Sequence, residues 1–155
     1  MLVNFVLNGN PVSPDIEART LLSDLLLDHF HLRSIHVGCE HGVCAACAVL
    51  VDGRAARSCI LLACQADGRS ITTVEGLLDR PYWSDLARTF VSCHAMQCGY
   101  CTPGMVIAFA DLIENRQPDK PAEALRAIEG HLCRCTGYQG LRAVAQWVDD
   151  WTPKP

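Results

Sequence analysis

Eight of the ten cysteines fall into two sets of four, and thiolate sulfur is a soft ligand that binds zinc, copper(I) and iron–sulfur clusters. The stretch GCEHGVCAACAVLVDGRAARSC contains the first set: Cys39, Cys44, Cys47 and Cys59. A C-x4-C-x2-C spacing with a fourth cysteine farther along is the ligand arrangement of plant-type [2Fe-2S] centres. The spacing therefore predicts a [2Fe-2S] cluster in the first set.

Two other kinds of site compete for the first set. A structural zinc ion usually joins two C-x2-C-like pairs, and the four-residue first gap is less typical of that use. A thioredoxin-like redox pair of Cys44 and Cys47 would stand at the start of a helix, but the residues that follow, AVLVDG, have the pattern of a strand. Both alternatives are therefore weaker than a cluster.

Small residues surround the first set. A cluster of two ferric ions, two sulfides and four thiolates carries a charge of about −2, so its sulfurs need hydrogen-bond donors. Gly38, Gly42, Ala45 and Ala46 would let main-chain N–H groups approach without steric clash. Glu40 is the exception, and we expect it to point into water.

The second set lies in QCGYCTPGM and HLCRCTGY and consists of Cys98, Cys101, Cys133 and Cys135. Its spacing allows a zinc site as well as a cluster, and Cys98 with Cys101 would also suit a dithiol catalyst. Cys101 stands just before an expected helix that has Thr102 as its cap and Pro103 at its first position. The helix dipole is therefore expected to stabilise a Cys101 thiolate.

The other candidate ligands have simpler interpretations. Cys64 and Cys93 stand apart from both sets, and buried free cysteine is common in protein cores, so we expect them to pack. Three histidines flank the cysteines: His41, His94 and His131. Because eight cysteines already complete two sets, we expect these histidines to lie on the surface or to support a site rather than bind metal.

The first half of the chain shows strand and turn patterns. Val3, Phe5 and Leu7 would lie on one face of a strand, and Asn-Gly and Asp-Gly pairs mark tight turns. We expect strands over residues 2–7 and 12–18, a helix over 21–30 with Thr20 as its cap, and a hairpin turn at Asp52-Gly53. Together they predict a small mixed sheet with one helix across it.

The second half shows helical periodicity. Four helices are expected, beginning near Pro81 with Ser84 as a cap, at Thr102, near Lys120 and at Gly140. The segment ENRQPDKPAE is interpreted as an exposed connection between helices. A shift of composition near residues 78–81 predicts two domains, 1–78 and 79–155. Domains this small commonly need a bound metal or another stabilising link in addition to their core. A cofactor in each domain would provide one.

Composition excludes several classes of protein. Half of the 155 residues are hydrophobic and the net charge is −4, which argues against disorder and against a nucleic-acid-binding surface. The longest apolar runs are too short to span a bilayer, and the first residues do not resemble a signal peptide. The cytoplasm is therefore the expected compartment.

The three motifs GCEHGVCAAC...RSC, QCGYCTPGM and LCRCTGY, in this order, resemble the iron–sulfur subunit of the molybdenum hydroxylase family. This family includes xanthine dehydrogenase, carbon monoxide dehydrogenase and aldehyde oxidoreductases, and the resemblance covers nearly the whole chain. It implies an α+β fold, in which a β-grasp ferredoxin-like domain precedes an all-α four-helix bundle. Each domain would hold one [2Fe-2S] cluster.

The resemblance also implies partners and a direction of electron flow. The second set would lie nearest a molybdopterin, in its cytosine dinucleotide form and carrying molybdenum, in a separate large subunit. Gln97 and Cys135 occupy positions that contact the pterin in the family. Electrons would leave through the first set to FAD in a medium subunit, and the complex would be a dimer of heterotrimers. The chain itself shows no catalytic motif or substrate pocket.

Two departures from the family and two rival functions remain. Family members usually have glycine at the position of Ala45 and threonine at the position of Ala48. The first rival function is a free-standing two-cluster electron carrier, but a lone ferredoxin needs only the first domain. The second is a zinc-stabilised interaction module.

Overall fold

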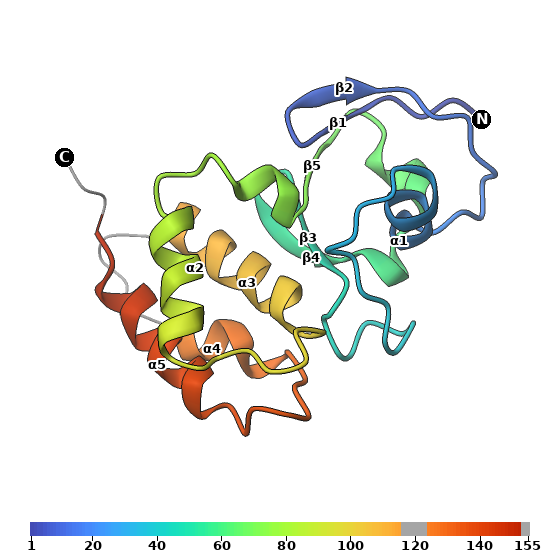
Figure 1. Ribbon diagram of the computed structural model, residues 1–155. Helices are drawn as coiled ribbons and strands as arrows, with labels where there is room; N and C mark the ends of the chain where they lie inside the picture. Colours follow the sequence, from blue (N-terminus) through green and yellow to red (C-terminus); the bar gives the residue numbers. More distant parts are fainter. Residues whose placement is uncertain (116–123, 153–155) are drawn as a thin grey trace.

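The computed structural model describes residues 1–115 and 124–152. These residues form a five-stranded sheet, to which the N-terminal part of the chain contributes every strand, and a group of helices from the C-terminal part (Figure 1). The sheet order is β2-β1-β5-β3-β4; β1 pairs in parallel with β5, and the other neighbours are antiparallel. The strands are β1 (Phe5–Leu7), β2 (Asn10–Val12), β3 (Ala48–Val51), β4 (Arg54–Arg57) and β5 (Ser70–Thr72). The predicted mixed sheet is confirmed.

Two tight turns shape the sheet. At the Asn8-Gly9 turn, φ is +50° and +83°, and at the Asp52-Gly53 turn it is +49° and +78°, as the turns of two-residue hairpins require. The expected first strand is shorter than predicted, because Leu2 pairs only through an isolated bridge with Asp15. The second strand covers Asn10–Val12 rather than the expected 12–18, because the turn uses only two residues and, of residues 13–18, only Asp15 pairs, through the isolated bridge.

Strand β3 is buried on both faces and joins two hydrophobic cores. Val49 packs into the core that α1 (Leu22–Asp24) covers, while Ala48 and Leu50 point into the core of the helical part. The alternation of side chains along a strand sends neighbouring residues to opposite faces. One strand therefore connects both halves of the molecule.

The predicted helix over residues 21–30 forms, but not as one regular α-helix. α1 continues as a π-helical turn, η1 (Leu25–His29), and Leu22 and Leu26 are buried beneath the sheet. The predicted cap at Thr20 is wrong. The helix has no side-chain cap; instead, the Leu22 N–H donates to the carbonyl of Leu61, and the carbonyl of Thr20 accepts from Ala63. Tertiary main-chain bonds replace the local cap.

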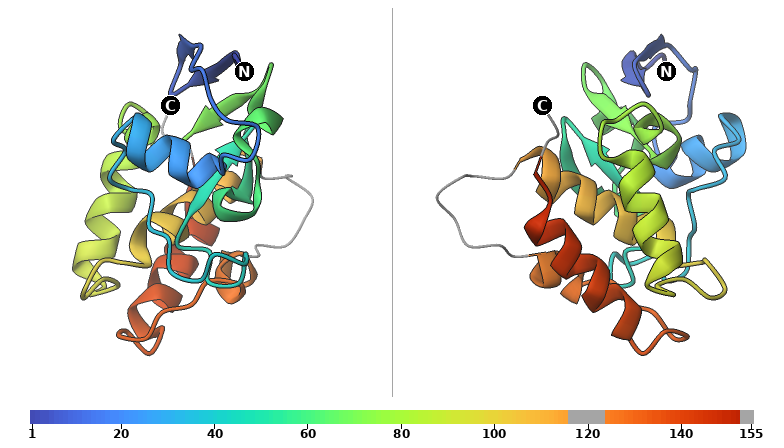
Figure 2. Two further views of the ribbon diagram at one scale, coloured as in Figure 1. Left: turned by 90° about the vertical axis from the view of Figure 1, so that its right-hand side faces the viewer. Right: turned by 60° about the vertical axis from the view of Figure 1, so that its left-hand side comes forward.

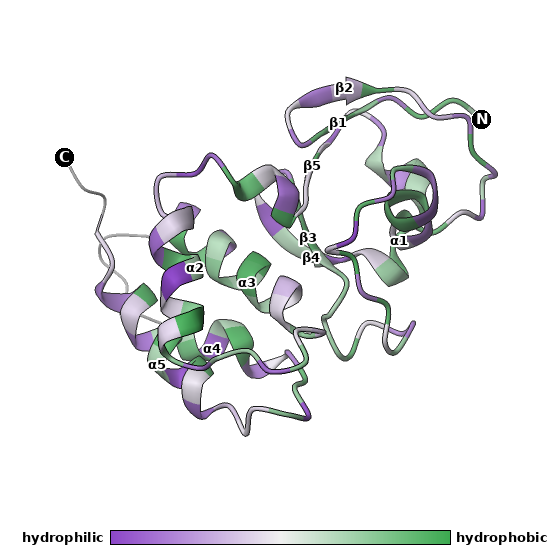
Figure 3. Cartoon of the chain, viewed as in Figure 1, coloured by the Kyte–Doolittle hydropathy of each residue, from purple (hydrophilic) through white to green (hydrophobic). Residues whose placement is uncertain are grey.

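Helix α3 occupies the centre of the helical part. Figures 1 and 2 show α3 between β3 and the other helices, and Figure 3 shows it as the most hydrophobic of them. Every residue from 104 to 110 is buried. The helices are α2 (Trp83–Ser92), α3 (Thr102–Glu114), α4 (Ala124–Glu129) and α5 (Gln139–Asp150), with short 3₁₀ turns η2 (Ser58–Ile60), η3 (Ala63–Ala66) and η4 (Val74–Leu77).

The predicted caps of α2 and α3 are wrong by a few positions. Tyr82 precedes α2, so Ser84 lies inside its first turn, and Cys101 takes the cap position that was expected at Thr102. The Thr102 hydroxyl is buried and has no hydrogen-bond partner among the residues that the structure describes. Most of the expected connection ENRQPDKPAE lies in residues 116–123, outside the described residues.

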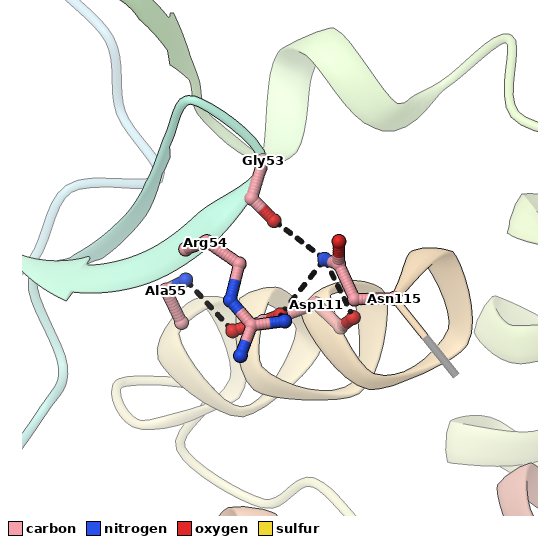
Figure 4. A network of polar contacts seen from close by, with 5 residues as sticks. All are labelled: Gly53, Arg54, Ala55, Asp111 and Asn115. Carbon is pink, nitrogen blue, oxygen red and sulfur yellow. Dashed lines mark hydrogen bonds and ion pairs between the residues drawn. The ribbon is translucent and has the colours of Figure 1, made fainter. Parts of the chain in front are cut away.

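Polar contacts hold the β3–β4 hairpin against α3 (Figure 4). One carboxylate oxygen of Asp111 accepts the Ala55 N–H at 2.8 Å, and the Asn115 amide donates to the Gly53 carbonyl at 2.7 Å. Arg54 also lies 3.3 Å from Asp111. In residues 1–115 and 124–152, no helix is both long enough and apolar enough to cross a membrane.

Candidate functional site

The β3–β4 hairpin brings two cysteines of the first set together. Cys47 directly precedes β3, and Cys59 follows β4 in η2, while the strand register pairs Ala48 with Arg57. The Ser58 hydroxyl donates to the carbonyl of Cys47 at 2.8 Å, which fixes the two ends of the hairpin to each other. Both cysteines are buried.

The loop before β3 supplies the other two cysteines of the first set. Glu40, Gly42 and Ala45 adopt positive φ angles of +56°, +80° and +60°, and such turns aim main-chain N–H groups inward. The Cys44 N–H lies 3.4 Å from the sulfur of Cys39. The side chain of Glu40 is exposed, as expected.

The thiols of the first set differ in acidity. Hydrogen bonds from the N–H groups of Cys44 and His41 lower the pKa of Cys39 to about 6. Burial, followed by the contact with Cys47, raises the pKa of Cys59 to about 11. A cation that binds this set must therefore displace a proton from Cys59, whereas Cys39 readily provides a thiolate.

The second set is assembled by the start of α3 and the loop after α4. Cys98 and Cys135 are exposed, and their sulfurs are 3.6 Å apart. Burial, followed by the hydrogen bond with Cys133, raises the pKa of Cys101 to about 12. In the metal-free thiol, burial outweighs the main-chain hydrogen bond at the helix start, so the expected stabilisation of a Cys101 thiolate does not appear as a net lowering of its pKa.

A short polar network holds Cys133. The Tyr138 hydroxyl accepts the Cys133 N–H at 2.8 Å and donates to the His131 carbonyl at 3.0 Å. The Thr136 hydroxyl donates to the sulfur of Cys133 at 3.1 Å. Burial raises the pKa of Cys133, but the hydrogen bonds from Thr136 and from main-chain N–H groups outweigh it, and the net shift is downward.

His131 is buried, which excludes one of the two roles expected of it and leaves the supporting one. It is only 2% exposed, and within residues 1–115 and 124–152 neither ring nitrogen makes a hydrogen bond of good geometry, although the main chain of Gly104 and Ala127 lies close enough to affect the ring. Burial, together with the nearby Arg57, lowers its pKa to about 4, so the ring is neutral at physiological pH. A surface position is therefore wrong for His131; only its place after the helix-ending Gly130 hinted at packing. Cys64 and Cys93 pack against the two cores, as expected.

The two sets are joined by main-chain contact. The Leu132 N–H donates to the carbonyl of Cys44 at 3.1 Å, and Leu132 directly precedes Cys133. One hydrogen bond therefore links a residue of the first set to the neighbour of a residue of the second.

The donor chemistry of both sets fits an iron–sulfur cluster. Each set presents four soft sulfurs, and the sulfurs of Cys39 and Cys133 receive donors from the Cys44 N–H and the Thr136 hydroxyl. Among residues 1–115 and 124–152, no three His, Cys, Asp or Glu side chains are close enough to hold one metal ion. Gln97 is exposed next to Cys98.

Two family models match successive parts of the chain. The 2Fe-2S iron-sulfur cluster binding domain matches residues 5–69, and the [2Fe-2S] binding domain matches residues 73–146. The 6-hydroxypseudooxynicotine dehydrogenase complex subunit beta of Paenarthrobacter nicotinovorans is 47% identical over 86% of this chain and 84% of its own length. The xanthine dehydrogenase iron-sulfur-binding subunit of Escherichia coli O157:H7 is 39% identical over 88% of this chain and 87% of its own. The chain belongs to the iron–sulfur subunits of the molybdenum hydroxylase family.

A solved structure agrees with this assignment. Quinoline 2-oxidoreductase from Pseudomonas putida 86 contains a chain that is 41% identical, with a TM-score of 0.81, covering 96% of this iron–sulfur subunit and 95% of that chain. The expected fold class, two [2Fe-2S] domains and a role as the electron-transfer component of an oxidoreductase are thus confirmed. The individual ligands of each cluster and the pterin contacts stay predictions.

Proposed function

We propose that this iron–sulfur subunit carries single electrons from a molybdenum cofactor in a large subunit to FAD in a medium subunit. Electrons would enter through the second set of cysteines and leave through the first. The unequal exposure of the two sets carries this proposal: Cys98 and Cys135 of the second set are exposed, whereas the first set has two partly exposed cysteines, Cys39 and Cys44, and two buried ones. Although Cys101 is buried, two proposed ligands of the second set thus reach the surface, where a partner's cofactor can approach them closely.

The eight cysteines are the proposed ligands: Cys39, Cys44, Cys47 and Cys59 in the first set, and Cys98, Cys101, Cys133 and Cys135 in the second. When bound, each [2Fe-2S] cluster supplies a one-electron carrier. The chain's own residues hold the sulfurs in place and donate hydrogen bonds to them, through the Cys44 N–H and the Thr136 hydroxyl. Such donors favour the more negative, reduced state.

Gln97 and Cys135 are the proposed contacts with the molybdopterin, in its cytosine dinucleotide form, of the large subunit. Both are exposed, and Gln97 stands next to Cys98, whose sulfur lies against that of Cys135. A pterin edge that docks at this surface would therefore meet an amide and a sulfur of the second set.

Further proposals are a domain boundary within the chain and the composition of its complex. We place the domain boundary between residues 78 and 79, which assigns all five strands to one domain and helices α2 to α5 to the other. The complex is proposed to be a dimer of heterotrimers in the cytoplasm.

The substrate of the complex is proposed to contain an aromatic ring nitrogen. The relatives compared above are named for 6-hydroxypseudooxynicotine, xanthine and quinoline, which all contain such rings. A panel of N-heteroaromatic compounds, aldehydes and carbon monoxide, offered to the purified complex, tests this proposal. Turnover of aldehydes alone would contradict it.

Two cysteine variants of the complex test the relay. With Cys47→Ser, substrate should still reduce the molybdenum site and the second cluster, but turnover with the natural acceptor should be lost. With Cys98→Ser, reduction of the first cluster by substrate should be lost. Cys64→Ser is the matched control, because Cys64 lies outside both sets. Full turnover of the Cys47→Ser complex would overturn the order of transfer.

Purification separates the rival functions. A free-standing carrier would elute alone, whereas a subunit elutes with large partners and molybdenum. A zinc module would be colourless and contain zinc, whereas the relay requires brown protein with two [2Fe-2S] signals in the reduced state.

A further inference from the structure

Tyr100 belongs to the second set by position but contacts the segment that leads into the first set. It stands between Cys98 and Cys101 in the sequence. Its ring stacks on that of His36, with a centroid distance of 4.6 Å and an interplanar angle of 18°. Its hydroxyl donates to the carbonyl of Val37 at 2.9 Å. The side chain of Tyr100 therefore bridges the two halves of the molecule.

The contact between His36 and Tyr100 is reciprocal. The Nδ1 atom of His36 lies 2.7 Å from the main-chain carbonyl oxygen of Tyr100, within hydrogen-bond distance. Each residue thus touches the other's segment through a ring and through a polar atom. We call these three contacts (the ring stack, the Tyr100 hydroxyl on Val37, and His36 Nδ1 on the Tyr100 carbonyl) the Tyr100 clasp.

The Tyr100 clasp reaches the first set itself. A Cβ atom placed on Gly38 would lie 3.5 Å from Cε1 of Tyr100 and 3.5 Å from the sulfur of Cys44. The edge of the Tyr100 ring and a sulfur of the first set therefore border the same small space. Cys39 follows Gly38 directly, so a shift of the clasp would move the loop that presents the first set.

Building on the relay proposed above, we propose that Tyr100 is a positioning residue that fixes the separation of the two clusters through its clasp on His36 and Val37. Electron transfer between two carriers and the magnetic interaction of their unpaired spins both weaken as the distance grows. A residue that holds Cys98 and Cys101 against the loop of Cys39 therefore controls both quantities.

Tyr100 can be replaced without disturbing the core. The Tyr100 side chain is 46% exposed, so a smaller residue leaves no closed cavity in the core. The hydrogen bond between Leu132 and Cys44 is a main-chain contact that does not involve the Tyr100 side chain, so we expect it to persist in such variants. Loosening of the clasp should therefore change the spacing and order of the two sets without unfolding either half.

The test is the magnetic interaction between the two clusters in the purified, fully reduced complex, measured by low-temperature electron paramagnetic resonance. Tyr100→Phe removes the hydroxyl and keeps the ring, Tyr100→Leu removes both, and His36→Ala removes the stacking partner. We expect the splitting to narrow slightly in Tyr100→Phe and clearly in the other two, with iron and sulfide contents unchanged. The control is His29→Ala, an exposed histidine at the end of η1 that packs edge-on against Phe30 and makes none of the three contacts of the clasp.

An unchanged splitting in both Tyr100→Leu and His36→Ala, with both clusters present, overturns the inference and leaves the relay intact. If Tyr100→Leu loses the second cluster, His36→Ala decides alone, because it alters no residue of the cysteine motifs. If the unmodified complex shows no pair of [2Fe-2S] signals, the proposed function fails and the inference fails with it.

Discussion

Gly104, near the start of α3, lies directly against the carbonyl of Ala45 in the loop of the first set. A Cβ atom on Gly104 would stand 2.1 Å from that carbonyl oxygen and 3.2 Å from the Cα of Ala46. The same carbonyl accepts the Ala48 N–H at 3.1 Å at the entrance to β3. The absence of a side chain on one residue thus permits the helix of the second set to touch the loop of the first.

Gly104→Ala should destabilise the chain by roughly 1–3 kcal/mol, because the added methyl group meets main-chain atoms that cannot rotate away. Chemical denaturation of the cluster-loaded complex measures this change. Gly130→Ala is the control, because its Cβ would meet only the flexible end of the Arg57 side chain at 3.0 Å. Equal stability of the two variants would show that α3 can move away from the loop at little cost.

Asp111→Ala should cost more stability than Arg54→Ala. Asp111 accepts the Ala55 N–H, and its removal leaves that donor unsatisfied, which costs about 1–3 kcal/mol. The Arg54 side chain is 68% exposed, so its ion pair with Asp111 is worth less than about 1 kcal/mol. Thermal unfolding of both variants tests this order. A larger loss in Arg54→Ala would mean that the ion pair, rather than the main-chain bond, holds the hairpin to α3.

Thr136→Val should lower the reduction potential of the second cluster. The hydroxyl of Thr136 donates to the sulfur of Cys133, and a donor to a cluster sulfur stabilises the extra electron. Thr136→Ser retains a hydroxyl and should stay close to the original potential. A redox titration followed by paramagnetic resonance reports both clusters, and the first serves as an internal standard. Equal potentials in the valine and serine variants would exclude the hydrogen bond as the cause.

Loading of the metal-free chain with iron and sulfide should become stronger as the pH rises. The pKa values of Cys59 and Cys101 are raised to about 11 and about 12, so both thiols hold their protons at neutral pH and must release them on binding. Cys39, with a pKa of about 6, is largely ionised already above that pH. Visible absorbance of reconstituted protein measures loading from about pH 6.5 to about pH 9. A flat profile would contradict proton release at these two cysteines.

Predictions that depend only on the local geometry of the main chain were reliable. Asn8-Gly9 and Asp52-Gly53 need positive φ angles that few residues tolerate, so the hairpin turns could be predicted. Helix caps were less predictable, because the Leu22 N–H and the Thr20 carbonyl bond to the distant residues Leu61 and Ala63, and the Thr20 hydroxyl is not needed. The π-helical turn at Leu25–His29 had no signal in the leucine-rich pattern.

The cysteine spacing provides a prediction for the membership of the two sets, but it does not indicate their environments. The exposure of Cys98 and the burial of His131 depend on how the loop after α4 packs against the rest of the bundle. The contact of Tyr100 with Val37 joins residues 63 positions apart. Periodicity and motif spacing describe neighbours along the chain, so such contacts become visible only after folding.

The exposed pair of sulfurs at Cys98 and Cys135 also has a consequence for assembly in an aerobic cell. Susceptibility of a thiol to peroxide depends on access and on thiolate character; Cys98 and Cys135 are exposed, and Cys39 is partly exposed with a pKa of about 6, whereas Cys47 and Cys59 are shielded. Oxidative damage to a newly made subunit should therefore begin at these three accessible thiols and spare the buried ones. Rapid binding to the large partner would then protect the unassembled protein from oxidation, in addition to completing the enzyme.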